Sequence, residues 1–209
     1  MTYRDVLEVL ATARGACPAI GGPGLLSRLL WATEREHTSI YQMELGYPTA
    51  VALGLALALP DERVVAVEGD GSMLAGLGVL TTAARYRAPN LVVLVCDNGV
   101  YGTVGGGTVE SATRHGVDLA AVADACGWQG TTVVVETTRQ AADALSRAWR
   151  EPGPWLIVAR VSHTPNDRAG DVGQIPLDVV EGAMAFRQEI LRRTRDAGHD
   201  SGSWGSVRP

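Results

Sequence analysis

Residues 64–72 read VVAVEGDGS, and residues 91–102 read LVVLVCDNGVYG. Each stretch starts as a short, continuous apolar run, which is typical of a central strand in a parallel sheet because both faces of such a strand are buried. Each then changes to glycine, acidic and amide residues. In open α/β sheets, ligands bind at the carboxyl ends of the strands. We therefore expect a binding site where the two strands, at 64–67 and 91–96, come to an end.

The residues that follow these two strands supply oxygen donors. Asp70 offers a carboxylate and Asn98 an amide oxygen, and both are hard ligands suited to a Mg²⁺ ion that bridges to a phosphate group. Gly69 and Gly71 let the backbone approach a ligand closely, and the N-terminus of a following helix favours an anion. Asp-Gly and Asn-Gly pairs are also common turns, so either pair alone has an ordinary structural explanation. Together, each directly after a buried strand, they favour a metal–diphosphate site.

The rest of the chain alternates between helical and strand patterns. A capping box is expected at residues 2–5 and opens the first helix. Further helices are expected at 25–35, 48–59, 72–87, 118–126, 138–150 and 177–195, of which 48–59 is apolar on nearly all sides and therefore expected to be buried. Further strands are expected around 19–20, at 132–135 and at 155–161, with a glycine-rich loop at 99–115. This order predicts an α/β fold, a parallel sheet with helices on both faces, in one domain over residues 1–195 with a flexible tail at 196–209.

The composition limits the classes of function. The chain has 209 residues, of which 46% are hydrophobic and 20% charged, and this suits one folded domain of ordinary size. Its net charge of −5 argues against a nucleic-acid or anionic-membrane surface, because such surfaces need clustered positive charge. The three cysteines form no metal-binding pattern, and the most apolar run, at 50–59, is far shorter than the ~20 residues of a membrane span. A cytoplasmic protein in a reducing compartment is expected.

Gly69-Asp70-Gly71, followed after residues 72–96 by Asp97-Asn98, resembles the thiamine diphosphate motif, in which GDG is followed further along the chain by NN. Asp97 departs from this motif at its first Asn, whereas the metal-binding Asn is kept as Asn98. Residues 101–106, YGTVGG, are similar to the YGSTGG stretch of phosphonopyruvate and sulfopyruvate decarboxylases. Residues 46–59 and 117–127 are similar to further segments of these enzymes, and the resemblance covers most of the chain. It implies the thiamine diphosphate-binding fold.

The resemblance implies which residues hold the cofactors thiamine diphosphate and Mg²⁺. The metal would be held by the side chains of Asp70 and Asn98 and by the carbonyl of Val100. Gly71 and Ser72 would contact the diphosphate with backbone and hydroxyl groups, because burying its negative charges requires a cation and aligned N–H donors. The cofactor-binding set is completed by Met43, Leu45, Gly69, Tyr101, Gly102 and Thr103. A tyrosine in the core is the structural alternative for Tyr101.

Residues 43–46, Met-Glu-Leu-Gly, would form the turn that meets the rings of the cofactor. By the resemblance, Leu45 is the large apolar residue under the bent cofactor, its N–H faces the ring, and the Met43 carbonyl accepts a hydrogen bond from the 4′-amino group. Leu45 is therefore a candidate catalytic residue, and a core leucine before a turn is the alternative. Glu44 departs from the family's Gly-Ser-Met-Gly. As a second catalytic candidate it would face the partner chain, face the substrate or retune the site.

His115 is the third catalytic candidate. It lies in the glycine-rich loop, where it would contact an anionic substrate group, although a histidine in such a loop is more often only solvated. His163 and Arg168 lie in a polar stretch, residues 162–173, that would fold over the site as a lid or form a solvated loop. His37 has the same two interpretations, functional or solvated.

Thiamine enzymes also need a carboxylate that hydrogen-bonds the pyrimidine N1′, and this group lies on a separate pyrimidine-binding domain. A chain of 209 residues has room only for the diphosphate-binding domain. The resemblance therefore implies a second subunit that supplies the glutamate, in an α₂β₂ or larger assembly. The expected activity is decarboxylation of a small 2-oxo acid of the phosphonopyruvate or sulfopyruvate type. The alternatives are a carboligase similar to acetolactate synthase, the β subunit of a 2-oxo acid oxidoreductase, and a non-catalytic domain.

Overall fold

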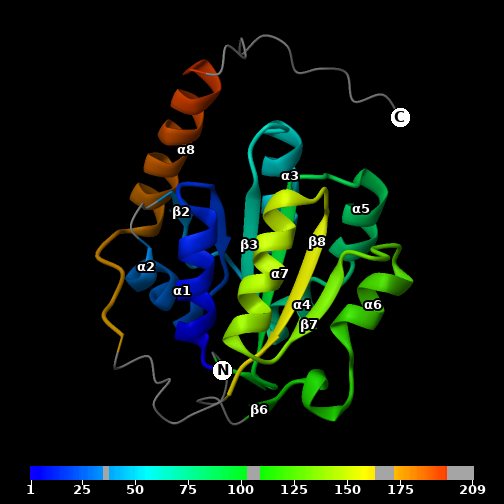
Figure 1. The fold of residues 1–209 in the computed structure, drawn as a ribbon. Coiled ribbons are helices and arrows are strands. Elements are labelled where there is room, and N and C mark those ends of the chain that lie inside the picture. Colours follow the sequence, from blue (N-terminus) through cyan, green and yellow to red (C-terminus); the bar gives the residue numbers. More distant parts are fainter. Residues whose placement is uncertain (35–37, 103–108, 163–171, 197–209) are drawn as a thin grey trace.

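The computed structural model describes residues 1–34, 38–102, 109–162 and 172–196. Within them, parallel strands form one sheet in the order β2-β1-β3-β4-β8-β7 (Figure 1). The strands are β1 (Ala19–Gly21), β2 (Ser39–Ile40), β3 (Val64–Gly69), β4 (Leu91–Asp97), β7 (Thr132–Val135) and β8 (Trp155–Arg160). The predicted parallel sheet is confirmed, and the apolar runs at 64–67 and 91–96 form its central strands β3 and β4.

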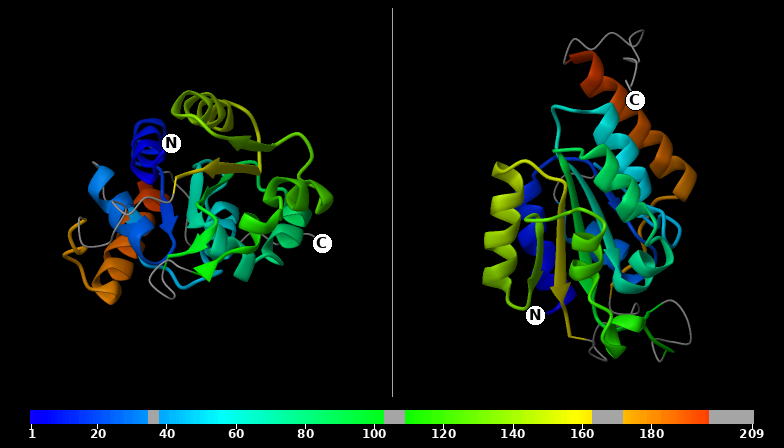
Figure 2. Two further views of the ribbon diagram at one scale, coloured as in Figure 1. Left: turned by 90° about the horizontal axis from the view of Figure 1, so that it is seen from below. Right: turned by 90° about the vertical axis from the view of Figure 1, so that its right-hand side faces the viewer.

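Helices cover both faces of the sheet, as Figure 2 shows from two further directions. One face carries α1 (Tyr3–Arg14), α2 (Leu25–Thr33) and α7 (Thr138–Arg150). The other face carries α3 (Pro48–Ala58), α4 (Asp70–Ala75), α5 (Val79–Tyr86), α6 (Leu119–Ala125) and α8 (Val179–Asp196). None of these described helices is both long enough and apolar enough to cross a membrane. The described residues therefore form three layers with the sheet in the middle.

Capping residues explain where several helices begin. At the start of α1, the Asp5 N–H donates to the Thr2 hydroxyl at 3.2 Å, and the Thr2 N–H donates to the Asp5 carboxylate at 2.8 Å. This is the predicted capping box, which satisfies backbone donors that the helix itself leaves free. Thr137 and Gln140 form a second capping box at the start of α7. The Asp118 side chain accepts from two backbone N–H groups at the start of α6.

Side chains of β3 alternate between two hydrophobic cores. Val65 and Val67 pack in the core beneath α1, α2 and α7, whereas Val64 and Ala66 pack in the core beneath α3 to α6. The alternation continues to the end of the strand and turns Glu68 toward the side of α3 and α4. A charged side chain is thus carried into the apolar layer next to the predicted site.

The prediction of one helix at 72–87 is wrong in one respect, because the structure has two helices there. Helix α4 ends at Ala75 and α5 begins at Val79. A Cβ added to Gly76 would lie 2.2 Å from the Gly46 carbonyl oxygen, so the backbone at Gly46 packs directly against the end of α4. The break in the helix therefore coincides with the place where the turn at 43–46 docks.

The prediction of a glycine-rich loop at 99–115 is wrong in part, because the segment contains regular secondary structure. Strand β5 (Val100–Tyr101) pairs antiparallel with β6 (Val109–Glu110), and the 3₁₀ helix η2 (Ala112–His115) follows. The short strand β2 was also not expected, because two residues carry no periodic pattern.

Helix α3, which is apolar on nearly all sides and therefore expected to be buried, is buried on one side only. Ala52, Leu53 and Ala56 pack in the core. On the opposite side, Tyr47 just before the helix is 58% exposed, and Leu57 is 45% exposed. In the part of the chain that the structure describes, an apolar outer face of α3 is therefore left uncovered.

Candidate functional site

The carboxyl ends of β3 and β4 lie side by side at one edge of the sheet, at the bottom of Figure 1 and facing the viewer in the left-hand view of Figure 2. The register pairs Gly69 with Cys96, so Asp70 and Asp97 are the next residues on adjacent strand ends. The chain order reverses beside them, since β1 leads to β2 on one side and β3 leads to β4 on the other. Ligands of open α/β sheets bind at such a reversal.

Two buried carboxylates, those of Asp70 and Asp97, are joined through hydroxyl groups. The Ser111 hydroxyl donates to Oδ2 of Asp70, and Thr113 Oγ1 lies 3.2 Å from the same oxygen. Thr113 Oγ1 also lies 2.7 Å from Oδ1 of Asp97, the shorter of its two contacts, so the hydroxyl donates to Asp97 and lies between the two acids. Asp70 is 1% exposed and Asp97 is 3% exposed. Ser111 reaches the site because the hairpin folds the chain back, with the Ser111 N–H donating to the Gly99 carbonyl at 2.9 Å.

The electrostatics of this cluster favour a cation. Burial raises the pKa of the Asp70 carboxyl group, the hydrogen bond from Ser111 opposes the rise, and the charge of Asp97 adds to it. A bound cation would relieve both the desolvation of Asp70 and its repulsion from Asp97. Ser111 and Thr113 both approach Oδ2, so among the described side chains their hydroxyls leave Oδ1 of Asp70 open to a further ligand.

Asn98 forms the turn that follows β4. Its Oδ1 accepts a hydrogen bond from the Val100 N–H at 3.0 Å, which fixes Val100 relative to the amide. An amide oxygen has a second lone pair, so Asn98 can still act as a metal ligand. Among the described residues, no group of three His, Cys, Asp or Glu side chains is placed to hold a metal ion. The mixed set of carboxylate, amide and carbonyl oxygens at Asp70, Asn98 and Val100 nevertheless fits Mg²⁺, which shares its coordination with phosphate oxygens and water.

Asp97 stands where the motif has its first Asn, and the structure shows how its charge is balanced. Arg160, at the end of the neighbouring strand β8, places Nη1 2.5 Å from Oδ2 of Asp97. The Gly99 N–H donates to Oδ1 of Asp97 at 3.1 Å. The Asp97 side chain is 2% exposed and that of Arg160 is 39% exposed, so the pair is half-buried. The additional negative charge that Asp97 introduces into the motif is therefore balanced by Arg160 on the neighbouring strand.

Asp97→Asn is expected to lower the free energy of unfolding by about 1–2 kcal/mol, because it removes a half-buried ion pair but keeps an acceptor for Thr113 and Gly99. Chemical denaturation of Asp97→Asn, Arg160→Met and the double variant would measure the coupling between the two side chains. A coupling energy near zero would contradict the assignment of Arg160 as the residue that balances Asp97.

A third buried acid, Glu68, precedes the GDG turn and is 1% exposed. The Thr49 hydroxyl donates to its Oε1, and the Ser72 hydroxyl donates to its Oε2 at 2.6 Å. Burial raises the pKa of Glu68, and these two hydrogen bonds oppose the rise. A hydroxyl has one proton, so Ser72 donates to Glu68 and accepts from the Gly46 N–H at 3.0 Å. The predicted contact between Ser72 and a diphosphate therefore depends on the backbone N–H of Ser72.

The turn at 43–46 contains the residues predicted to meet the rings of a cofactor. The Met43 N–H donates to the Gly21 carbonyl at 2.9 Å, which ties the turn to the end of β1. Leu45 is half-buried, and its N–H donates to the exposed Glu44 carboxylate at 3.1 Å. The structure thus brings Met43, Glu44 and Leu45 together beside the site, and their roles toward a cofactor stay predictions.

Tyr101 contacts the backbone of the GDG turn. A Cβ added to Gly71 would lie 2.5 Å from Cδ1 of the Tyr101 ring. Gly71 therefore allows the close approach of this ring, and the role of Tyr101 toward a cofactor stays a prediction. Gly102 follows and is exposed, whereas Thr103 lies outside the described residues.

His115 lies outside the buried cluster of Asp70 and Asp97. Its Nε2 lies 2.9 Å from the carboxylate of Glu110, and both side chains are largely exposed. In the described part of the chain it makes no hydrogen bond to the buried acids. The other weak candidates, His37, His163 and Arg168, lie outside the described residues.

Sequence reasoning missed Glu68, Ser111, Thr113 and Arg160. Glu68 and Arg160 carry a signal that could have been used, since each is a charged residue at the end of an otherwise apolar strand. Ser111 and Thr113 carry no such signal, because only the return of the β5–β6 hairpin brings them to the site.

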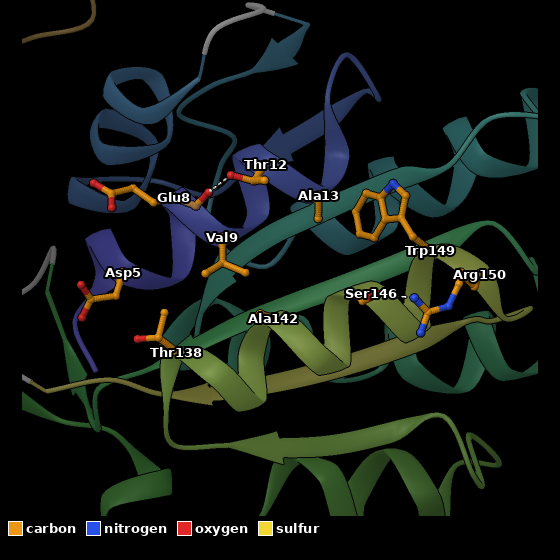
Figure 3. A pocket seen from close by; sticks show the side chains of 10 residues that line it. All are labelled: Asp5, Glu8, Val9, Thr12, Ala13, Thr138, Ala142, Ser146, Trp149 and Arg150. Atoms are coloured by element: carbon orange, nitrogen blue, oxygen red, sulfur yellow. Dashed lines mark hydrogen bonds between the residues drawn. The ribbon is translucent and has the colours of Figure 1, made fainter.

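A groove of about 550 Å³ lies between α1 and α7 (Figure 3). Its lining includes the apolar residues Val9, Ala13 and Trp149 and the charged residues Asp5 and Arg150. None of its lining residues belongs to the cluster at the ends of β3 and β4, so the groove is separate from the candidate site.

Comparisons with known proteins agree with the motif. Residues 20–159 match the family described as thiamine pyrophosphate enzyme, C-terminal TPP binding domain. Phosphonopyruvate decarboxylase of Streptomyces viridochromogenes is 35% identical over 180 residues, which are 86% of this chain but only 44% of that protein. Sulfopyruvate decarboxylase subunit beta of Methanothermobacter thermautotrophicus is 32% identical over 174 residues, covering 83% of this chain and 86% of the relative. The solved thiamine diphosphate-dependent 4-hydroxybenzoylformate decarboxylase of Rhodococcus jostii shares the fold, with a TM-score of 0.63 at 22% identity over 78% of this chain and 33% of that one.

Proposed function

This chain belongs to the thiamine pyrophosphate enzyme family as a C-terminal TPP binding domain, and on that basis we propose that it is the diphosphate-binding subunit of a Mg²⁺-dependent 2-oxo acid decarboxylase. The oxygen donors at the adjacent ends of β3 and β4 carry the proposal. Asp70, Asn98 and the Val100 carbonyl would hold Mg²⁺, and the ion would hold the diphosphate. The substrate class is taken to be that of the relatives, phosphonopyruvate or sulfopyruvate.

Each part of the site has a distinct task in this proposal. Thiamine diphosphate, when bound, supplies the electron sink that makes decarboxylation of a 2-oxo acid possible. The N–H groups at the start of α4, beside Gly71, would orient the diphosphate. The Met43 carbonyl would accept a hydrogen bond from the aminopyrimidine, and the Leu45 side chain would provide an apolar contact for the rings of the cofactor. Ser111 and Thr113 would hold the Asp70 carboxylate in one orientation for the metal.

A second subunit that supplies the pyrimidine-binding half is part of the proposal. Three relatives carry the name subunit beta, and the chain spans less than half of the phosphonopyruvate decarboxylase it matches. The uncovered outer face of α3, with Tyr47 and Leu57 exposed, supports a partner, because residues 45–60 contain no charged side chain. This face continues directly from the turn at 43–46, so a subunit seated on it would also reach the cofactor rings.

A carboligase is the second candidate. Acetolactate synthase of Bacillus subtilis is 31% identical over 128 residues, although these are only 22% of that protein. Asp70, Asn98 and the turn at 43–46 would serve both reactions equally, since the two differ in whether a proton or a second carbonyl compound is added after CO₂ leaves.

Product analysis of the reconstituted complex tests both candidates. The chain, combined with a pyrimidine-binding subunit from the same genome, should release CO₂ and the corresponding aldehyde from phosphonopyruvate or sulfopyruvate when Mg²⁺ and thiamine diphosphate are present. A carboligated product formed only when an acceptor ketone or aldehyde is added would favour the second candidate. Full activity of this chain without a partner would contradict the two-subunit architecture.

A further inference from the structure

Glu68 is a buried carboxylate to which the proposed function assigns no task. It is 1% exposed, and within the described part of the chain its partners are the hydroxyls of Thr49 and Ser72 and the backbone N–H of Thr49, not cations. Burying an acid without a cation is costly unless both oxygens are hydrogen-bonded. The hydroxyls of Thr49 and Ser72 supply those bonds, one to each oxygen. The Glu68 carboxylate is thus buried at a cost in desolvation free energy, and its surroundings supply the hydrogen bonds that offset this cost. Such an arrangement indicates a specific structural role for this side chain.

The hydrogen bonds of Glu68 connect three separate elements. Thr49 belongs to the first turn of α3, and Ser72 to α4. Ser72 in turn accepts the Gly46 N–H at 3.0 Å, so the network extends from β3 through α4 to the turn at 43–46. That turn is the proposed contact for the rings, whereas residues 69–72 are the proposed contact for the diphosphate. Glu68 therefore lies behind the junction of the two contacts.

A carboxylate suits this position better than an amide. Both neighbours are hydroxyls that donate, and an ionised carboxylate accepts at both oxygens. This direction of donation leaves the Ser72 lone pairs free to accept from Gly46. A glutamine would present an NH₂ group to one hydroxyl, so that hydroxyl would have to direct its proton elsewhere. The chain of hydrogen bonds from Glu68 to Gly46 would then lose its defined direction.

We infer that Glu68 is a positioning residue that fixes the turn at 43–46 relative to the turn at 69–72, and so sets the distance between the ring contact and the diphosphate contact of the cofactor. The inference rests on the proposed function. It assigns Glu68 no contact with cofactor or substrate. Its effect passes through the Ser72 hydroxyl to the Gly46 N–H.

Two probes separate this role from a general effect on folding. Inorganic pyrophosphate with Mg²⁺ reports only on the diphosphate contact, whereas thiamine diphosphate with Mg²⁺ reports on both contacts. The chain and its partner subunit are first assembled, and this complex is then titrated with each probe in a calorimeter. Glu68→Gln should raise the Kd of thiamine diphosphate roughly tenfold, because this is the loss of affinity expected when a hydrogen bond to a charged group is disrupted. The Kd of pyrophosphate should be unchanged or lower, because the substitution removes a negative charge.

Ser72→Ala keeps the backbone N–H and should have the same effect: the Kd of thiamine diphosphate should rise, and the Kd of pyrophosphate should not. The double variant should be no weaker than either single variant by more than about twofold, because both changes interrupt the same chain of hydrogen bonds. Asn90→Ala is the matched control. Asn90 is a buried polar residue whose side chain bonds the carbonyls of Ala56, Leu59 and Glu62, so its loss should lower stability without changing the ratio of the two Kd values.

The possible failures are distinguishable. If thiamine diphosphate and pyrophosphate weaken equally in Glu68→Gln, or if neither changes, the positioning role is overturned and the proposed function stands. If the unmodified complex binds neither probe in the presence of Mg²⁺, the proposed function is overturned and the positioning role with it.

Discussion

Asp70→Ala is expected to weaken the Mg²⁺-dependent binding of thiamine diphosphate by at least about 100-fold, which corresponds to ~2.7 kcal/mol. Asp70 is the only anionic group in the proposed ligand set, since Asn98 and the Val100 carbonyl are neutral. Asp97 cannot replace it, because Arg160 occupies one of its oxygens and Thr113 and Gly99 the other. Calorimetric titration with and without Mg²⁺ measures the loss directly.

The same variant should remain folded. In the unmodified chain Asp70 is a desolvated acid close to a second acid, so its removal relieves repulsion while it leaves the hydroxyls of Ser111 and Thr113 without one partner. These effects oppose each other, and the free energy of unfolding should change by no more than about 1 kcal/mol. Asp143→Ala, an exposed acid on α7, is the control and should leave cofactor affinity unchanged. Retained Mg²⁺-dependent affinity in Asp70→Ala would remove the basis for the metal assignment.

The central strands and the donors at their ends are predictable because the information is local. The apolar runs at 64–67 and 91–96 place the two central strands, and the polar residues directly after them place Asp70 and Asn98 at the strand ends, although β3 continues to Gly69 and β4 to Asp97. The rest of the cluster depends on contacts between distant residues. Ser111 meets Asp70 across 41 positions of the chain, and Arg160 meets Asp97 across 63, and neither pairing has a periodic signal.

The uncovered face of α3 shows a second limit of prediction from the sequence. An apolar pattern on all sides of a helix predicts burial, but it does not say whether the covering surface belongs to the same chain. In α3 one side is covered by the sheet, while Tyr47 and Leu57 remain exposed on the other. The pattern and the exposure agree if the second covering surface comes from a partner, which is what the proposed two-subunit architecture provides.

Gly76→Ala is expected to lower the free energy of unfolding by about 3 kcal/mol, because overpacking against backbone cannot be relieved by a side-chain rotation. The new Cβ would lie 2.2 Å from the Gly46 carbonyl oxygen and 2.9 Å from its carbonyl carbon. Gly46 cannot yield easily, since it has a positive φ of 85° and its N–H is bonded to Ser72. Displacement of this turn should also weaken thiamine diphosphate binding. Thermal or chemical denaturation measures the first effect, and calorimetric titration the second.

Gly78→Ala provides the control two residues away. Gly78 has a φ of −60°, which alanine adopts readily, and a Cβ added there would meet nothing within 4 Å. This variant should be neutral or more stable by about 0.4–1 kcal/mol, because alanine reduces the conformational freedom of the unfolded chain. The two substitutions are chemically identical, so a large difference between them measures the packing of the turn at 43–46 on α4. If Gly76→Ala and Gly78→Ala have similar stability and similar cofactor affinity, the turn is not held at the end of α4, and the spacing between ring contact and diphosphate contact must be set elsewhere.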